Sequence, residues 1–394
     1  MVDDPESVQL MIVGASVRAA AQSAQAAGLH VTLATDMFGD QDLVSCVANY
    51  VPLEAGYRNF FNVLQKHSVE KSGLTGWLYT GAMENYPELV GAGPIRLLGN
   101  SAAVLARIRD PWRLADSLSQ AGLPMAKLSR IHAQRDVTLR WLRKPFKSAA
   151  GLGIELMPAH SDRVARVGPK LESSTTETHY FQEMISGRSF GALYLAAGGD
   201  CALIGVARQF IGPEFGTPGQ FQYAGSIGPV PLSPDDHRQW LLIGRQLAAD
   251  FGLTGLFGVD AILSGDLLYV VEVNPRYTAA AEVFERVLEV PVVRVHVDAC
   301  LTGVLPDLHI AVNGLWAGKR VVYATRAVHV SDVVQDVMSS PSVTSYQFAD
   351  LPQTGSKIPA GAPIATVLAG PLPSEADVGR ALTEGIHVLE SLFD

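Results

Sequence analysis

The chain has 394 residues, of which 48% are hydrophobic and 18% are charged, so it is long enough for two or three well-buried domains and is not a disordered protein. Its net charge of −9 argues against a general nucleic-acid surface or an anionic-membrane surface. No apolar run reaches the ~18 residues of a membrane span, and the acidic first residues do not resemble a signal peptide. Cys46, Cys201 and Cys300 are scattered, which predicts neither a disulfide framework nor a zinc site. We therefore expect a cytoplasmic protein with no nucleic-acid or membrane partner.

The N-terminal segment has a strand–helix–strand pattern. Apolar runs at 8–13 and 30–34 flank an alanine-rich segment at 17–27, which predicts a βαβ unit with a parallel sheet. Gly14 permits a tight turn before the helix, and helix starts can bind anions. The full Gly-x-Gly-x-x-Gly pattern is missing, so a dinucleotide site has little support.

Several polar residues follow the predicted strands of this first domain. Ser16 can cap the helix, whereas Arg18 in its first turn opposes the helix dipole, which hints at ligand binding. Glu84 and Asn85 follow another strand at 77–81. Ligands of open α/β sheets lie at such strand ends, so we expect Ser16, Arg18, Glu84 and Asn85 to contact a substrate. The alternative for each residue is a solvated loop position.

The stretch 253–276 carries the most specific pattern in the chain. Two apolar runs surround Ser264-Gly265-Asp266, which predicts a β-hairpin. Asp260 on the first strand and Glu272 and Asn274 on the second supply oxygen atoms that suit Mg²⁺ on phosphates. Arg276 follows and can hold a phosphoryl or carboxylate oxygen. The alternative is a surface hairpin whose acids face water.

A second candidate phosphate site lies earlier in the chain. Lys144 lies in a predicted strand at 141–146, and the small-residue loop at 147–153 follows it. Small residues let backbone N–H groups approach phosphate oxygens closely, and the lysine adds a point charge. An ordinary hairpin with a glycine-rich turn is the alternative for this segment taken alone.

Together these segments resemble the ATP-grasp superfamily, and the Asn-x-Arg ending resembles its biotin-carboxylase-like branch. The resemblance implies ATP and two Mg²⁺ (or Mn²⁺) ions as cofactors, with Arg276 and Lys144 as catalytic cations. It also implies a hinge at 179–187 that binds adenine. The residues carried over to ATP are Lys144, Ser148, Gly151, Gly153, Gln182, Glu183 and Ile185, and those carried over to metal are Asp260, Glu272 and Asn274.

This sequence departs from the family pattern at two positions. Pro111 stands where relatives carry an ATP-binding lysine, so Arg107, Arg109 or Arg113 is expected to replace it, and Arg109 is the residue that we assign to ATP. Ser189 stands where many relatives carry a ribose-binding acid.

The remaining segments complete the predicted domain order. Segment 212–228 is expected to be a loop over the substrate, and a helix at 277–290 is expected to turn Glu282 and Glu285 toward substrate or water. Lys319 and Arg320 are expected to be solvated. We predict an α/β protein, α+β in its core, with the ATP-grasp fold. Its predicted parts are a Rossmann-like parallel-sheet domain (1–97), an ATP-grasp domain (98–313, with lobes 98–185 and 186–313) and a β-rich domain with a terminal helix (314–394).

The predicted function is an ATP-dependent ligase that joins a small-molecule carboxylate to an amine through an acyl phosphate, releasing ADP and phosphate. Two alternatives stay open: a nucleotide-binding protein of this fold without ligase turnover, and a carboxylase that uses bicarbonate. The assembly is left open, with a homodimer as one possibility.

Overall fold

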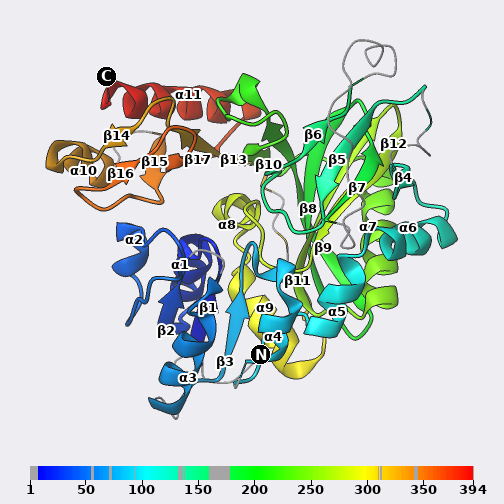
Figure 1. The fold of residues 1–394 in the computed structure, drawn as a ribbon, viewed down its shortest axis with the longest axis horizontal. Coiled ribbons are helices and arrows are strands. Elements are labelled where there is room, and N and C mark those ends of the chain that lie inside the picture. Colours follow the sequence, from blue (N-terminus) through cyan, green and yellow to red (C-terminus); the bar gives the residue numbers. More distant parts are fainter. Residues whose placement is uncertain are drawn as a thin grey trace.

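The computed structural model describes residues 8–393 except 55–56, 71–72, 94, 132–135, 137, 159–177, 309, 311–312 and 341–344. An N-terminal α/β region and a C-terminal region lie on one side of the molecule, and the larger central region lies on the other (Figure 1). The mixed α/β class expected from the sequence is confirmed, because a parallel sheet and large antiparallel sheets occur in one chain.

The predicted βαβ unit opens the N-terminal region. β1 (Gln9–Val13), α1 (Arg18–Ala26) and β2 (His30–Thr35) follow in order, and β3 (Gly76–Tyr79) pairs with the other side of β1. Both pairings are parallel. The strands are buried along nearly their whole length, as expected when helices cover a parallel sheet. The shorter elements of this region are α2 (Gln41–Val44), α3 (Phe60–Glu70), the 3-10 helix η3 (Met83–Asn85) and α4 (Pro87–Gly91).

Two capped helices begin the first lobe. Ser101 accepts a hydrogen bond at the start of α5 (Ala102–Ile108), and Asp110 accepts two at the start of α6 (Pro111–Gln120). Ser and Asp side chains just before a helix commonly bind its free backbone N–H groups in this way. An antiparallel sheet of order β4-β7-β5-β6 follows, with β4 (Leu128–Ser129), β5 (Trp141–Pro145), β6 (Glu155–Leu156) and β7 (His179–Glu183).

An eight-stranded sheet of order β12-β11-β8-β9-β10-β13-β17-β15 forms the centre of the protein. The hairpin predicted at 253–276 is its edge, with β11 (Gly255–Ser264) and β12 (Leu267–Asn274) joined across Gly265 and Asp266. The other strands are β8 (Arg188–Ala197), β9 (Asp200–Ile211), β10 (Tyr223–Gly228), β13 (Trp316–Tyr323), β15 (Tyr346–Ala349) and β17 (Pro363–Leu372).

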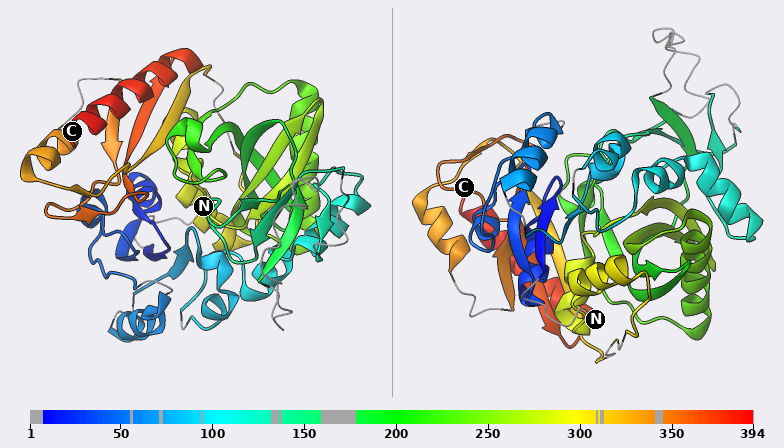
Figure 2. Two further views of the ribbon diagram at one scale, coloured as in Figure 1. Left: turned by 45° about the horizontal axis from the view of Figure 1, so that its top comes forward. Right: turned by 90° about the horizontal axis from the view of Figure 1, so that it is seen from below.

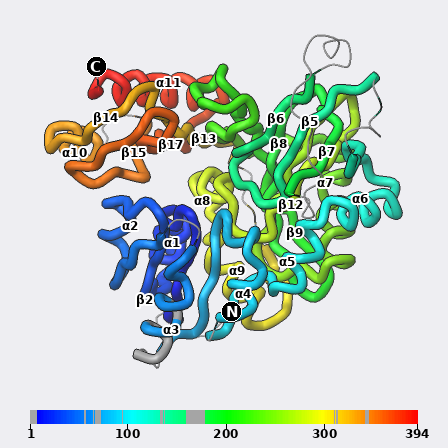
Figure 3. The backbone as a smooth tube through the Cα atoms, in the orientation of Figure 1, coloured from blue at the N-terminus to red at the C-terminus, as the bar shows by residue number. Residues whose placement is uncertain are grey.

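Helices cover both faces of this sheet (Figures 2 and 3). Side chains alternate across β8: Tyr194 stacks on Phe257 in the core beneath α7 (Pro234–Phe251), with ring centroids 4.8 Å apart. Leu193 and Leu195 point into the opposite core, beneath α8 (Ala281–Leu288) and α9 (Val292–Thr302). Helix α1 belongs to this second core, which therefore ties the N-terminal region to the central sheet.

The C-terminal region continues the central sheet. β13 pairs with β10 in antiparallel fashion, so the sheet runs through the predicted boundary at residue 314. α11 (Glu375–Ser391) covers it and shares a core with Phe210 and Ile227 of the preceding region. The small elements here are α10 (Asp332–Ser339), β14 (Val328–His329) and β16 (Lys357–Ile358). Within the described ranges, no helix is both long enough and apolar enough to cross a membrane.

Candidate active site

A cavity of about 660 Å³ lies between the sheet of the first lobe and the central sheet. It brings together residues that are far apart in the sequence, from β5, β7 and the hairpin. Nine predicted site residues line it: Lys144, Gly151, Gln182, Glu183, Ile185, Asp260, Glu272, Asn274 and Arg276. The sequence therefore located its main polar groups.

The two acids of the hairpin face each other across paired strands. Asp260 lies opposite Glu272 in the β11–β12 register, and a bulge follows Asp260. Burial, together with the nearby Glu272 charge, raises the pKa of Asp260 to about 6. Its carboxylate accepts hydrogen bonds from Gln209 Nε2 at 2.7 Å and from Asn274 Nδ2 at 2.9 Å. The two donors offset part of the repulsion between the Asp260 and Glu272 carboxylates.

Glu272 remains the more acidic member of this pair. Burial by itself would raise the pKa of Glu272, but the Arg109 and Lys144 cations outweigh burial and lower it. Arg109 Nη1 donates to Glu272 Oε1 at 2.5 Å, and Lys144 Nζ donates to Gln182 Oε1 at 3.0 Å. Two cations, Arg109 and Lys144, therefore lie near enough to Glu272 to lower its pKa.

The donor set fits a divalent cation. Asp260, Glu272 and the amide oxygen of Asn274 are hard oxygen ligands, and a cation between the two acids would relieve the repulsion that raises the Asp260 pKa. This candidate site has two carboxylates and one amide. The described part of the chain contains no cluster of three His, Cys, Asp or Glu side chains that could hold a metal.

Arg276 is held from two sides. Its Nη2 lies 2.7 Å from Glu84 Oε1, and Glu84 is only 1% exposed. The same Nη2 donates to Asn274 Oδ1 at 3.2 Å, and Nη1 donates to the Tyr277 carbonyl at 3.0 Å. Glu84 was predicted to contact substrate directly, but it does not line the cavity and instead orients the arginine that does.

The glycine loop lies against the segment that precedes β10. A Cβ added to Gly151, which has φ +77°, would come within 1.9 Å of the Phe221 carbonyl oxygen, so only glycine fits there. The Tyr223 N–H donates to the Ala150 carbonyl at 3.1 Å. Gly153 and Ser148 do not line the main cavity: the Ser148 hydroxyl donates to the Leu152 carbonyl at 2.6 Å.

The three arginines near the Pro111 position have different surroundings. Arg109 reaches Glu272, whereas Arg107 bonds the Asp250 carbonyl and Arg113 is exposed beside Asp110. Arg109 lies behind Glu272 rather than in the main cavity, in a small adjoining space that Ser148 and Lys144 also line.

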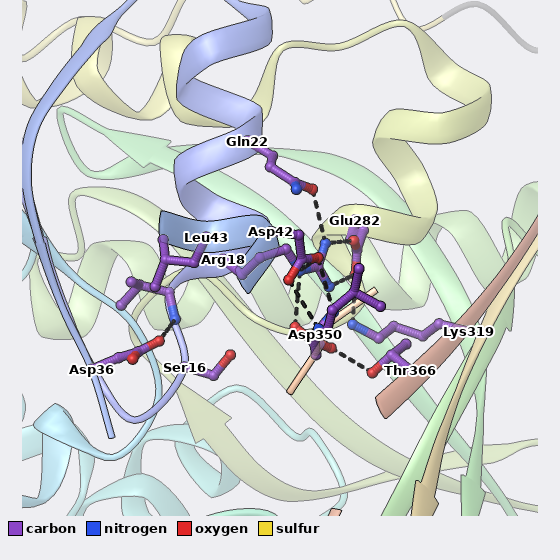
Figure 4. Close-up of polar contacts among 12 residues, drawn as sticks. Ser16, Arg18, Gln22, Asp36, Asp42, Leu43, Glu282, Lys319, Asp350 and Thr366 are labelled. Atoms are coloured by element: carbon purple, nitrogen blue, oxygen red, sulfur yellow. Dashed lines mark hydrogen bonds and ion pairs between the residues drawn. The ribbon is translucent and has the colours of Figure 1, made fainter. Parts of the chain in front are cut away.

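Arg18 does not occupy the site that the sequence suggested. It is 1% exposed and pairs with Glu282 of α8 and, at 2.9 Å, with Asp350 of the C-terminal region (Figure 4). Lys319 joins the same cluster through Glu282 at 2.6 Å. The expectations of a substrate-binding Arg18, a solvated Lys319 and a solvent- or substrate-facing Glu282 are therefore corrected. These three residues come from separate regions, and only the tertiary fold joins them.

Two further expectations are also corrected. Ser16 is exposed and does not cap α1; instead the Asp36 carboxylate accepts the Val17 N–H at 3.1 Å. Glu285 is half-buried, accepts from the Ser23 hydroxyl at 2.5 Å and does not line the cavity, so it does not face a substrate there.

Arg18→Ala should destabilise the protein by about 3–5 kcal/mol, because the buried Glu282 would keep only Lys319 and the half-buried Asp350 would lose the Arg18 cation. Equilibrium urea unfolding measures this loss. Burial by itself would raise the pKa of Glu282, but the Arg18 and Lys319 cations outweigh burial and hold it below its usual 4.5. The stabilisation that these ion pairs contribute is therefore present above pH 4.5 and is lost as the pH falls below it. Arg245→Ala, which removes an exposed pair with Asp200, is the control and should cost at most about 1 kcal/mol. Equal effects of the two substitutions would contradict the proposed importance of the cluster.

The sequence did not single out Gln209, Tyr223 or Ser226, which also line the cavity. Gln209 binds both Ser189 and Asp260, and the Tyr223 and Ser226 hydroxyls are 2.7 Å apart. Polar side chains within otherwise buried strands were the available signal. Ser189 lines the cavity with its hydroxyl donated to Gln209, so the position expected near ribose is part of this polar set.

The fold and the cavity define a class of protein in which two lobes enclose one site. One lobe supplies the β11–β12 hairpin with its oxygen ligands, and the other supplies Lys144 on β5. Residues 108–280 match the model of the ATP-grasp domain. The chain therefore contains an ATP-grasp domain over these residues.

Curated and solved relatives agree with this fold. An arginine-specific carbamoyl phosphate synthase large chain from Halalkalibacterium halodurans is 27% identical over 120 residues, which cover 28% of this chain and only 11% of that protein. The biotin carboxylase domain of Hydrogenobacter thermophilus 2-oxoglutarate carboxylase, solved as a dimer with MgADP, ADP and bicarbonate, has a TM-score of 0.71 at 15% identity, covering 95% of this chain and 89% of that one. An L-amino acid ligase from Bacillus licheniformis has a TM-score of 0.69 at 15% identity, covering 96% of each chain.

Proposed function

We propose that the protein is an ATP-dependent ligase that joins a small-molecule carboxylate to an amine through an acyl phosphate. The observation that carries this proposal is the arrangement of one cavity in which Asp260 and Glu272 lie with Lys144, and Arg276 follows at the end of the hairpin. Such a set of opposite charges suits the positioning and charge neutralisation that phosphoryl transfer requires.

ATP is the proposed phosphoryl donor, and Asp260, Glu272 and Asn274 are proposed to hold Mg²⁺ or Mn²⁺. When bound, the metal would offset the negative charge of the phosphate groups. Gln182, Glu183 and Ile185, which line the cavity on and after β7, are proposed to contact adenine. Lys144 lies on the neighbouring strand β5 and is proposed to contact the phosphates.

The proposed reaction needs no covalent protein nucleophile. A carboxylate oxygen of the substrate attacks the γ-phosphorus, and the bond to the ADP oxygen breaks. The amine nitrogen then attacks the acyl carbon, inorganic phosphate leaves, and the nitrogen loses a proton. Lys144 and Arg276 offset the negative charge that spreads over the transferring group.

A bicarbonate-using carboxylase is the second candidate. Its support is the fold similarity to biotin carboxylase domains, one of which was solved with bicarbonate. Nucleotide binding without turnover is the remaining alternative. A cytoplasmic location and a homodimeric assembly stay predictions.

A product assay tests the proposed reaction. The purified protein is incubated with ATP, Mg²⁺ and pooled carboxylates with or without pooled amines, and nucleotide products are separated by chromatography. ADP released only when both pools are present supports the ligase. ADP that requires bicarbonate instead supports the carboxylase, and AMP contradicts the acyl-phosphate route.

Lys144→Ala should weaken ATP binding roughly ten- to hundredfold, the cost of one charge-assisted hydrogen bond. Isothermal titration calorimetry with ATP and Mg²⁺ measures the change. Lys127→Ala removes an exposed lysine of the same lobe and should bind ATP like the wild type. Equal affinities for all three proteins would remove Lys144 from the nucleotide site.

A further inference from the structure

Residues 84–88 of the N-terminal region contact two separate segments that flank the cavity. Glu84 and Asn85 end η3, and Glu88 lies in the first turn of α4. Glu84 accepts from Arg276 Nε at 2.8 Å, while Asn85 donates to the Ser148 carbonyl at 3.0 Å. One short segment therefore contacts both the arginine after the hairpin and the glycine loop.

Three contacts hold the glycine loop to this segment. Besides the Asn85 bond, Lys147 Nζ lies 3.7 Å from Glu88 Oε1 and 4.8 Å from the centre of the Tyr86 ring. Asn85 is buried, whereas Lys147 and Glu88 are exposed, so the Asn85 bond is the one shielded from water. Asn85 is therefore expected to dominate the attachment.

Asn85 is also linked to Glu272 of the β11–β12 hairpin, because Arg109 bonds to both residues. Arg109 Nη2 donates to Asn85 Oδ1 at 3.1 Å and approaches the Ser148 carbonyl at 3.4 Å, while its Nη1 donates to Glu272. The amide of Asn85 thus fixes one edge of the guanidinium and leaves the other edge directed at Glu272. A planar five-donor group suits this double role.

From these contacts we infer that residues 84–88 form a positioning clasp, in which Asn85 sets the glycine loop and Arg109, and Glu84 sets Arg276. The N-terminal region thereby shapes the phosphate end of the cavity. The inference rests on the proposed function for the ligand concerned, an Mg²⁺-bound nucleotide, but the attachment of the loop is a property of the protein alone. None of the clasp residues lines the main cavity, so their action is exerted through Ser148, Arg109 and Arg276.

Trypsin provides a direct readout of the clasp, because Lys147 is exposed and immediately precedes Ser148. Asn85→Ala should raise the rate of cleavage after Lys147 roughly tenfold without nucleotide, because local opening of the loop becomes more frequent. Mass spectrometry identifies the cut, and cleavage after Lys144 does not interfere because Pro145 follows it. Asn59→Ala, which alters a different loop of the N-terminal region, is the matched control and should cleave like the wild type.

Two more measurements separate the clasp from a general loss of structure. Asn85→Asp keeps an acceptor for Arg109 but loses the donor to Ser148, so it should also speed cleavage while retaining the thermal melting temperature. Calorimetry with ADP and Mg²⁺ should show roughly three- to tenfold weaker binding for both variants. Unchanged cleavage after Lys147 in both variants would overturn the clasp. Failure of the wild type to bind MgADP would overturn the proposed function, whereas the cleavage result would still decide the clasp.

Discussion

Replacing Glu272 by glutamine should lower Mg²⁺-dependent ATP turnover by roughly a hundredfold or more. The substitution keeps the size of the side chain and an oxygen that can accept from Arg109, but it removes the charge that faces Asp260 across the hairpin. If these two acids hold the metal, the Mg²⁺ concentration for half-maximal turnover should also rise. Activity measured across a Mg²⁺ titration gives both quantities.

Glu155→Gln is the control for this experiment. Glu155 is an exposed acid of the first lobe that pairs with Arg143, so its loss should leave the titration unchanged. The melting temperature of Glu272→Gln without ligand reports the cost of weakening its pair with Arg109. A Glu272→Gln titration that matches the wild type would contradict the assignment of Glu272 to the metal.

Substituting Arg276 by lysine should reduce kcat by roughly 10²–10³ while the KM for ATP changes little. Lysine keeps one positive charge beside the buried Glu84, but it loses the flat multi-donor group that contacts Glu84, Asn274 and the Tyr277 carbonyl. Losing an interaction made chiefly in the transition state lowers kcat, whereas losing one made equally in the ground state raises KM. Steady-state kinetics with an identified substrate pair separate these outcomes.

Arg276→Ala is a less suitable test because it would leave Glu84 buried without its cation, at a cost of about 3–5 kcal/mol. The double variant Arg276→Met with Glu84→Gln avoids that isolated charge and should fold while remaining inactive. Arg113→Lys, at an exposed position of the first lobe, is the conservative control and should keep wild-type kinetics. Normal kcat in Arg276→Lys would contradict a role for this arginine in the transition state.

The proposed clasp links these two predictions. Glu84 holds Arg276, and Asn85 holds Arg109 against Glu272, so both catalytic assignments depend on one segment of the N-terminal region. A ligand that bound between this region and the cavity would therefore act on both groups together.

The sequence by itself determined the hairpin and its polar pattern. A tight turn at Gly265 and a side-chain period of two are local properties, so two adjacent antiparallel strands carrying Asp260, Glu272 and Asn274 could be predicted without a structure. The bulge after Asp260 could not, and without it the register of the turn would pair Asp260 with Val271 rather than with Glu272. The helix caps at Ser101 and Asp110 were predictable for the same reason, because a cap contacts backbone N–H groups only a few residues away.

The tertiary structure alone decided which charged groups meet. Arg18 is separated by 264 residues from Glu282 and by 332 from Asp350, and Arg109 by 163 from Glu272. No local pattern of charge or periodicity specifies such pairs, because their geometry depends on how the N-terminal region, the lobes and the continued central sheet pack together. The same packing buried Arg18 and placed Arg109 behind Glu272. A charge that is removed from water needs an oppositely charged partner, and here the partners come from distant parts of the chain.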